Sequence, residues 1–211
     1  MNEENLNLFT QSTKFLTSIR NACRRPAGIA AGRGCPLLAC AGFHHTKVGV
    51  IPTRRHLHYA SGFIELGMLR DAAKELRAIA KTDQRTPKVL TVWIDLHMHA
   101  RRWKPLIAVS RQLVRAEPQD DKGWISWAFG LRELNQVEAA RAVLLKAMPL
   151  HGKTCSVLHY NLACYECLLG NLPQAKRHLK IAADRDKEWR ESALADTDLE
   201  ALWPEIRAQG P

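Results

Sequence analysis

Apolar residues recur every three to four positions along the chain from residue 53 onward, which is the spacing of amphipathic helices. Short groups of glycine, asparagine and charged residues interrupt this pattern at regular intervals. The chain therefore reads as a series of helices of about four turns each, joined by loops of two to three residues. From residue 53 the pattern predicts an all-α fold.

The helical pattern also repeats along the chain. The segment YASGFIELGMLRDAAKELRAI (59–79) can be aligned with segments that begin at residues 93, 127 and 162, at offsets of 34, 34 and 35 residues. Small residues recur at two places in this frame, where they allow two helix backbones to approach closely. The first place holds Ala60, Ile94, Ala128 and Ala163, the second holds Ala72, Leu106, Ala140 and Ala175, and the intervening turn holds Gly67, Arg101, Asn135 and Gly170. Each copy thus predicts one hairpin of two helices.

This period and these positions resemble the tetratricopeptide repeat. Its pair of a large and then a small residue on the first helix is carried by Trp127–Ala128 and Leu162–Ala163, and Pro118 closes the second copy. One such hairpin cannot bury its own apolar face, so neighbouring hairpins must stack. The resemblance implies a right-handed α–α superhelix, or solenoid, of about four hairpins. The expected repeats span residues 53–86, 87–120, 121–155 and 156–187.

Two segments lie outside the repeats. Residues 188–211 predict a last helix, a turn with Asp196 or Asp198 as N-cap, and a short helix that stops at Pro204. They resemble the capping segment of such arrays, which covers the apolar face of the last repeat. Residues 1–52 contain no such periodicity, and no acidic residue occurs between Asn5 and Ile64. We expect a mostly disordered basic tail, with a targeting segment or a mis-called chain start as alternatives.

The charge of the chain is unevenly distributed. The net charge is +10, yet residues 1–55 contain eight Lys or Arg against two acids, and the remainder contains 23 against 19. The balanced remainder argues against a dedicated nucleic-acid-binding face. No apolar run reaches the roughly 18 residues that a membrane-spanning helix needs. The expected partner is therefore neither nucleic acid nor membrane. The six cysteines of this long, core-rich chain are expected to be reduced thiols, so the expected location is the cytoplasm.

The chain has one C-x-x-C motif, Cys164 and Cys167, which falls on the first helix of the fourth copy. A thioredoxin-like motif requires a βαβ unit, and a structural zinc site requires four ligands at a usual spacing, neither of which the sequence supplies. Asp95 and His99, one helical turn apart, are a possible acid–base pair but more simply a solvated one. We expect no enzyme activity, no catalytic residue, no metal site and no cofactor.

The resemblance to tetratricopeptide repeats implies a scaffold for protein–protein interaction. Such solenoids bind a peptide or helix of a partner protein in a concave groove lined by the first helices. The Lys and Asn that clamp a terminal carboxylate in the chaperone-binding subclass are absent, since Leu57 and Ser61 stand in their places. Alternatives are a self-associating structural spacer, which would be a homo-oligomer, and a metal or thiol protein that uses Cys164 and Cys167. The residues expected to line the groove are Ser61, Glu65, Thr91, Asp95, Met98, His99, Ile125, Phe129, Arg132, Tyr160, Cys164 and Cys167.

Overall fold

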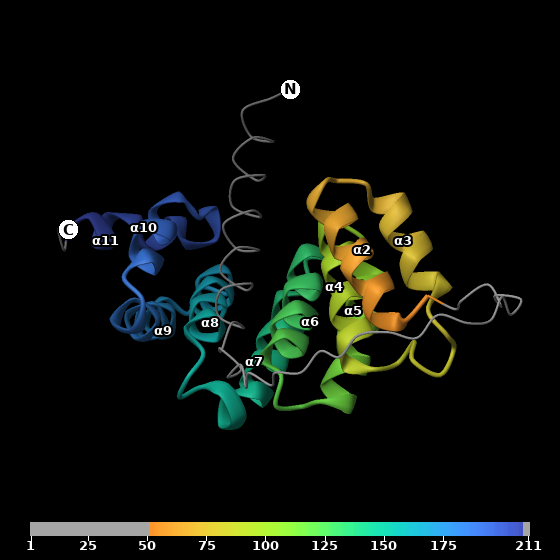
Figure 1. Ribbon diagram of the computed structural model, residues 1–211. Coiled ribbons are helices and arrows are strands. Elements are labelled where there is room, and N and C mark those ends of the chain that lie inside the picture. Colours follow the sequence, from red (N-terminus) through yellow and green to blue (C-terminus); the bar gives the residue numbers. More distant parts are fainter. Residues whose placement is uncertain (1–50, 209–211) are drawn as a thin grey trace, which may run out of the picture.

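A computed structural model describes residues 51–208, and this part of the chain is helical throughout, without any strand. The predicted all-α fold is thus confirmed for these residues, whereas the predicted tail of residues 1–52 lies almost wholly outside them. The helices are shown in Figure 1. They are α2 (Thr53–Glu65), α3 (Leu69–Ala78), α4 (Pro87–His99), α5 (Trp103–Ala116), α6 (Asp121–Glu133), α7 (Val137–His151), α8 (Ser156–Leu168), α9 (Leu172–Arg185), α10 (Glu188–Ala195), the 3₁₀ helix η1 (Thr197–Leu202) and α11 (Trp203–Ala208).

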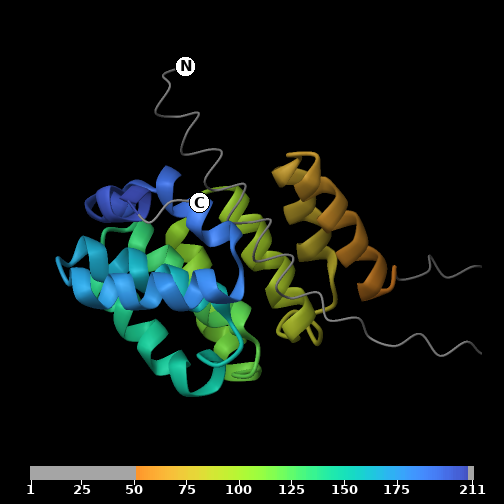
Figure 2. The same cartoon turned by 90° about the vertical axis from the view of Figure 1, so that its left-hand side faces the viewer.

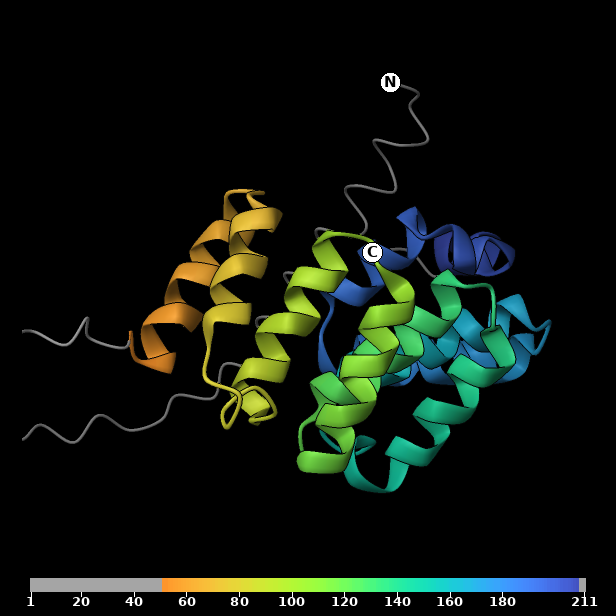
Figure 3. The same ribbon diagram turned by 90° about the vertical axis from the view of Figure 1, so that its right-hand side faces the viewer.

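The first eight of these helices form four hairpins, α2–α3, α4–α5, α6–α7 and α8–α9, and each predicted repeat contains one of them. The first helices of successive hairpins also touch, α2 with α4, α4 with α6, and α6 with α8. Figures 2 and 3 show the first hairpin at one end of the molecule and the C-terminal helices at the other. There α10 packs on α9, and η1 packs on α8 and α9.

The four turns within the hairpins share one backbone conformation. In the first hairpin the amide of Gly67 donates to the carbonyl of Ile64, and the amide of Met68 donates to the carbonyl of Phe63. This pair of bonds is the Schellman motif, which closes a helix with one residue in the left-handed region. The same two bonds end α4, α6 and α8. The left-handed residues are Gly67 (φ 73°), Arg101 (φ 50°), Asn135 (φ 59°) and Gly170 (φ 79°), the four that the sequence alignment places in the turn.

The aligned small positions form the contact between the two helices of each hairpin. All eight of these residues are completely buried, including Ile94 and Leu106, which replace alanine in the second copy. Around them lie three apolar clusters, the largest of which extends from α6 to η1 and α11. The regular burial explains why a period of 34 to 35 residues is visible in the sequence.

The C-terminal segment agrees with the prediction at one end and departs from it at the other. Asp196 is the N-cap of η1, and its side chain accepts a hydrogen bond from the amide of Asp198. Pro204, predicted to stop the helix, instead lies in the first turn of α11, where the missing amide hydrogen is not needed. None of the helices among residues 51–208 combines the length and the apolar character required to cross a membrane.

Candidate functional site

The twelve residues predicted to line a groove all lie on first helices of hairpins, but they differ in exposure. Ser61, Glu65 and His99 are exposed, whereas Thr91, Asp95, Phe129 and Arg132 are half-buried. The other five are buried. Met98 and Ile125 belong to apolar clusters between helices, and Tyr160, Cys164 and Cys167 lie on α8 beneath the C-terminal segment. The structure thus corrects the expectation of an open surface for these five residues.

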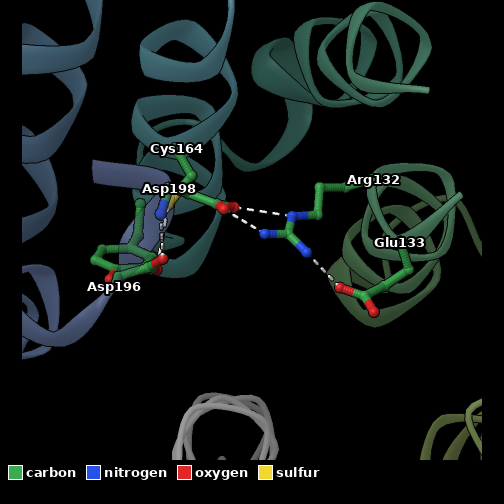
Figure 4. Close-up of polar contacts among 6 residues, drawn as sticks. Arg132, Glu133, Cys164, Asp196 and Asp198 are labelled. Carbon is green, nitrogen blue, oxygen red and sulfur yellow. Dashed lines mark hydrogen bonds and ion pairs between the residues drawn. The ribbon is translucent and has the colours of Figure 1, made fainter. Parts of the chain in front are cut away.

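A polar cluster joins α6, α8 and the start of η1, as Figure 4 shows. Its centre is the ion pair between Arg132 on α6 and Asp198 on η1, two residues 66 positions apart in the sequence. The guanidinium donates through Nε and Nη2 to the two carboxylate oxygens of Asp198, with an Nε–Oδ2 distance of 2.8 Å. Its Nη1 donates to Oε1 of Glu133 at 2.7 Å. Such two-pronged contacts fix orientation as well as adding energy.

The second half of the polar cluster surrounds Asp196. The hydroxyl of Tyr160 donates to its Oδ2 at 2.9 Å, and the thiol of Cys164 approaches the same oxygen at 3.6 Å. Its Oδ1 accepts the amide of Asp198 at 3.0 Å. The ring of Tyr160 also packs on Trp189 of α10, with ring centroids 4.4 Å apart. Asp196 is therefore held by α8 on one side and by its own 3₁₀ turn on the other.

Burial controls the ionisation of the groups in the cluster. It raises the pKa of the Cys164 thiol well above its usual value, and the neighbouring carboxylates of Asp196 and Asp198 raise it further. Burial likewise raises the pKa of Cys167 and of the Tyr160 hydroxyl. Burial, followed by the charge of Asp198, also raises the pKa of Asp196. Since the thiolate is the reactive form of cysteine, neither thiol has the low pKa of a nucleophile or redox centre.

For Arg132 the effects oppose one another. Burial by itself would lower the pKa of the guanidinium, but the hydrogen bond and charge of Asp198, followed by Glu133, more than offset it and raise the pKa. Arg132 therefore remains a cation while it is surrounded by carboxylates.

The possibility of a metal site can be weighed from the donor set. Within residues 51–208, one group of three candidate ligands has its donor atoms within 4.8 Å of one another, namely Cys164, Asp196 and Asp198. Both oxygens of Asp198 are engaged by Arg132, and Asp196 accepts bonds from Tyr160 and Cys164. A bound ion would have to compete with these partners and would need Cys164 as a thiolate. The geometry instead satisfies the carboxylates with hydrogen-bond donors.

The possible acid–base pair of Asp95 and His99 does not form between the side chains. His99 Nδ1 lies 2.9 Å from the backbone oxygen of Asp95, while the Asp95 carboxylate makes an ion pair with Lys122 of α6 at 2.7 Å. This ion pair joins α4 to α6. The carboxylate therefore serves a contact between neighbouring hairpins.

Sequence reasoning missed the partners that the C-terminal segment supplies. The sequence predicts Asp196 as a helix cap, but its contact with Tyr160 and the contact of Asp198 with Arg132 connect segments more than 30 residues apart. The available signal is the pair of acids two positions apart, Asp196 and Asp198, followed by Leu199 and Leu202. That pattern marks a charged turn with an apolar side, although it does not say where the turn will pack.

Comparison of the chain with models of protein families finds no matching family, and comparison with curated proteins finds no match.

Proposed function

We propose that this protein is a scaffold that binds a peptide or helix of a partner protein on the face formed by the first helices of its hairpins. In this proposal the four hairpins stack as tetratricopeptide repeats in a right-handed superhelix. The proposal is supported by the matching Schellman turns, the eight buried residues at aligned positions, and the contacts of α2 with α4, of α4 with α6 and of α6 with α8. Repetition of one unit gives a long surface that few other helical arrangements provide.

The observation that carries this proposal is the position of the chain's own residues 196–202. They lie against α8, and Asp198 reaches Arg132 on α6, so a short segment is held by side chains of two first helices. The contact combines a charged clamp with buried leucines, which is the mixture that peptide-binding grooves use. The same surface continues along α4 and α2, where Ser61 and His99 are exposed.

The proposal assigns the protein no catalysis. The two thiols of the C-x-x-C motif have raised pKa values and lie beneath η1 and α10, and the acid of the Asp95–His99 pair binds Lys122. Each candidate for chemistry in the described part of the chain thus has a structural partner. These groups support a role in holding helices together.

Site-specific photo-crosslinking would test the proposal. The full chain would carry benzoylphenylalanine in place of Ser61 or His99 on the first helices, and in matched controls in place of Gln112 on α5 or Glu138 on α7. All four positions are exposed. After irradiation in an extract of cells that produce the protein, we expect the same protein adduct from Ser61 and His99 and none from the two controls. Equal adducts at all four positions, or none at any, would contradict the proposal.

A further inference from the structure

The C-terminal segment has the composition of a short peptide ligand. Asp196 and Asp198 place two carboxylates two positions apart, and Leu199 and Leu202 follow on the 3₁₀ turn. Both leucines are essentially fully buried in the apolar cluster that contains residues of α6 to α9. The segment is thus held by charge at its beginning and by apolar contact at its end. Each half binds a different part of the same surface.

The surface that receives this segment comes from two hairpins. Arg132 on α6 supplies the charged clamp, and Tyr160 on α8 supplies a hydroxyl donor. The Arg132 side chain is 28% exposed and Glu133 is 23% exposed, so the clamp is open to water on one side. A clamp at the edge of an interface can be reached by a competing carboxylate without unfolding the helices that carry it.

The electrostatics of the segment are not optimal in its bound position. The guanidinium of Arg132 binds the carboxylates of Asp198 and Glu133, and the half-buried Asp196 lies beside Asp198. Like charges in a partly buried site oppose one another. The turn from α9 to α10 consists only of Asp186 and Lys187, so the chain keeps its own segment close to the surface that the segment covers. This covalent connection raises the effective concentration of the segment at that surface.

We propose that residues 196–202 are a built-in, displaceable occupant, and that the surface of Arg132 and Tyr160 binds a partner segment with two carboxylates two positions apart followed by two leucines. This inference rests on the proposed function and names the partner chemistry and the regulation of one part of that face. When the partner is absent, the chain's own segment covers the apolar surface. When it is present, the acidic segment of the partner takes the clamp of Arg132.

The test uses the full chain and a fluorescein-labelled synthetic peptide of residues 188–208. Asp198→Asn in the protein weakens the internal occupant and leaves Arg132 in place. Fluorescence anisotropy should show the peptide binding this variant at least about tenfold more tightly than the wild type, the ratio expected for loss of a charged hydrogen-bond pair. The same peptide carrying Asp198→Asn is the control ligand, and its affinity for the variant protein should be lower by about the same factor. Arg132→Gln added to the variant protein should abolish the gain.

A second control separates release of the segment from general loosening. Lys176 on α9 pairs with Glu205 on α11, and both side chains are about half exposed. Lys176→Gln therefore removes an ion pair to the same C-terminal segment but leaves the clamp intact, and it should not raise peptide affinity. Equal gains from Lys176→Gln and Asp198→Asn would overturn the proposal, as would peptide binding to Asp198→Asn no tighter than to the wild type.

A separate measurement covers the case in which Asp198→Asn fails to fold. A protease site inserted between Asp186 and Lys187 allows the folded chain to be cut, so that its own C-terminal piece remains bound without a covalent link. Native mass spectrometry should then show exchange of this piece for excess labelled peptide. A piece that does not exchange would overturn the inference. If crosslinking at Ser61 and His99 still captured a partner, the proposed function would survive that result.

Discussion

Helices α2 and α8 begin the first and the last hairpin and occupy equivalent positions in the repeat, but their surroundings differ greatly. Three of the thirteen residues of α2 are buried, whereas eleven of the thirteen residues of α8 are buried. The first hairpin leaves Tyr59, Leu66 and Met68 exposed, with Leu66 at 74% of its maximum. In the last hairpin, α8 is covered by α7, α9 and η1.

Two polar residues of α8, Glu166 and His159, bind partners at α7 and at the start of α9. The buried carboxylate of Glu166 binds Arg141 of α7 and Asn171 at the start of α9. His159 Nε2 lies 2.9 Å from the carbonyl of Gly152. In α2, His56 pairs with Glu75 at 2.7 Å, and the hydroxyl of Thr53 donates to the carboxylate of Asp83 at 2.5 Å. The comparison teaches that one repeated pattern can give helices of very different burial, and that the segment after the repeats supplies part of the cover of α8.

The largest expected effect comes from removing an anchor that covers α8. Leu199 on η1 is fully buried, so Leu199→Ala should lower the free energy of unfolding by about 3 kcal/mol through lost burial and a cavity. Leu66→Ala in the first hairpin is the control, since an exposed leucine should change it by no more than about 0.5 kcal/mol. Urea unfolding followed by circular dichroism measures both. Similar losses for the two variants would remove the difference between the two ends.

The next effect concerns the charged contact between α6 and η1. Arg132→Gln leaves the carboxylate of Asp198, which is 11% exposed, without its main partner, and should cost about 2 kcal/mol. Lys176→Gln removes an exposed ion pair to the same segment and should cost less than about 1 kcal/mol. The rate of amide hydrogen exchange in η1, and in the part of α8 that η1 covers, should rise in Arg132→Gln alone. Unchanged exchange would show that the leucines hold the segment without the clamp.

The sequence could predict what repeats. The positions of Gly67, Arg101, Asn135 and Gly170 in one turn, and the burial of the aligned small residues, follow from local propensity and from a spacing that recurs. These features depend on neighbours within a few residues, or on the next copy of the same unit. A single chain therefore contains enough information to locate them.

The sequence could not predict which lining positions are covered. Tyr160 and Cys164 face the same way in the repeat as Ser61, yet η1 and α10 bury them and leave Ser61 exposed. The contact of Asp198 with Arg132 depends on the direction of the chain after α9, which has no counterpart in earlier copies. Helical periodicity fixes the face on which a residue lies. It does not identify what packs on that face.

The two ends of the molecule also differ in how their stability should respond to acid, because a buried histidine, His97, lies near the first hairpin. Burial, with smaller effects from Arg102 and Arg77, lowers the pKa of His97 from 6.5 to about 4, and its ring stacks on Trp93. A lowered pKa means that the unfolded chain takes up the proton first. The contribution of neutral His97 to the free energy of unfolding is therefore fully present above pH 6.5 and is lost as the pH falls toward 4.

We expect His97→Phe to remove about 1–2 kcal/mol of the acid destabilisation between these pH values, after allowance for partial exposure of the site. His159 and His178 in the last hairpin also have lowered pKa values, caused first by burial, so the variant should retain part of the effect. Thermal unfolding at a series of pH values would measure it. A variant with the full acid sensitivity of the wild type would assign that sensitivity to the last hairpin instead.

The smallest expected effect concerns the backbone conformation that the hairpin turns share. Arg101 adopts φ 50°, a conformation that favours glycine. The equivalent residue of the last hairpin is a glycine, Gly170. Arg101→Gly should therefore stabilise the protein by about 0.5–1 kcal/mol, because relief of backbone strain exceeds the added entropy of the unfolded chain. Gly170→Ala should destabilise it by about 1 kcal/mol for the reverse reason. Changes of equal sign in the two variants would mean that side-chain contacts, and not the shared backbone conformation, determine the stability of these turns.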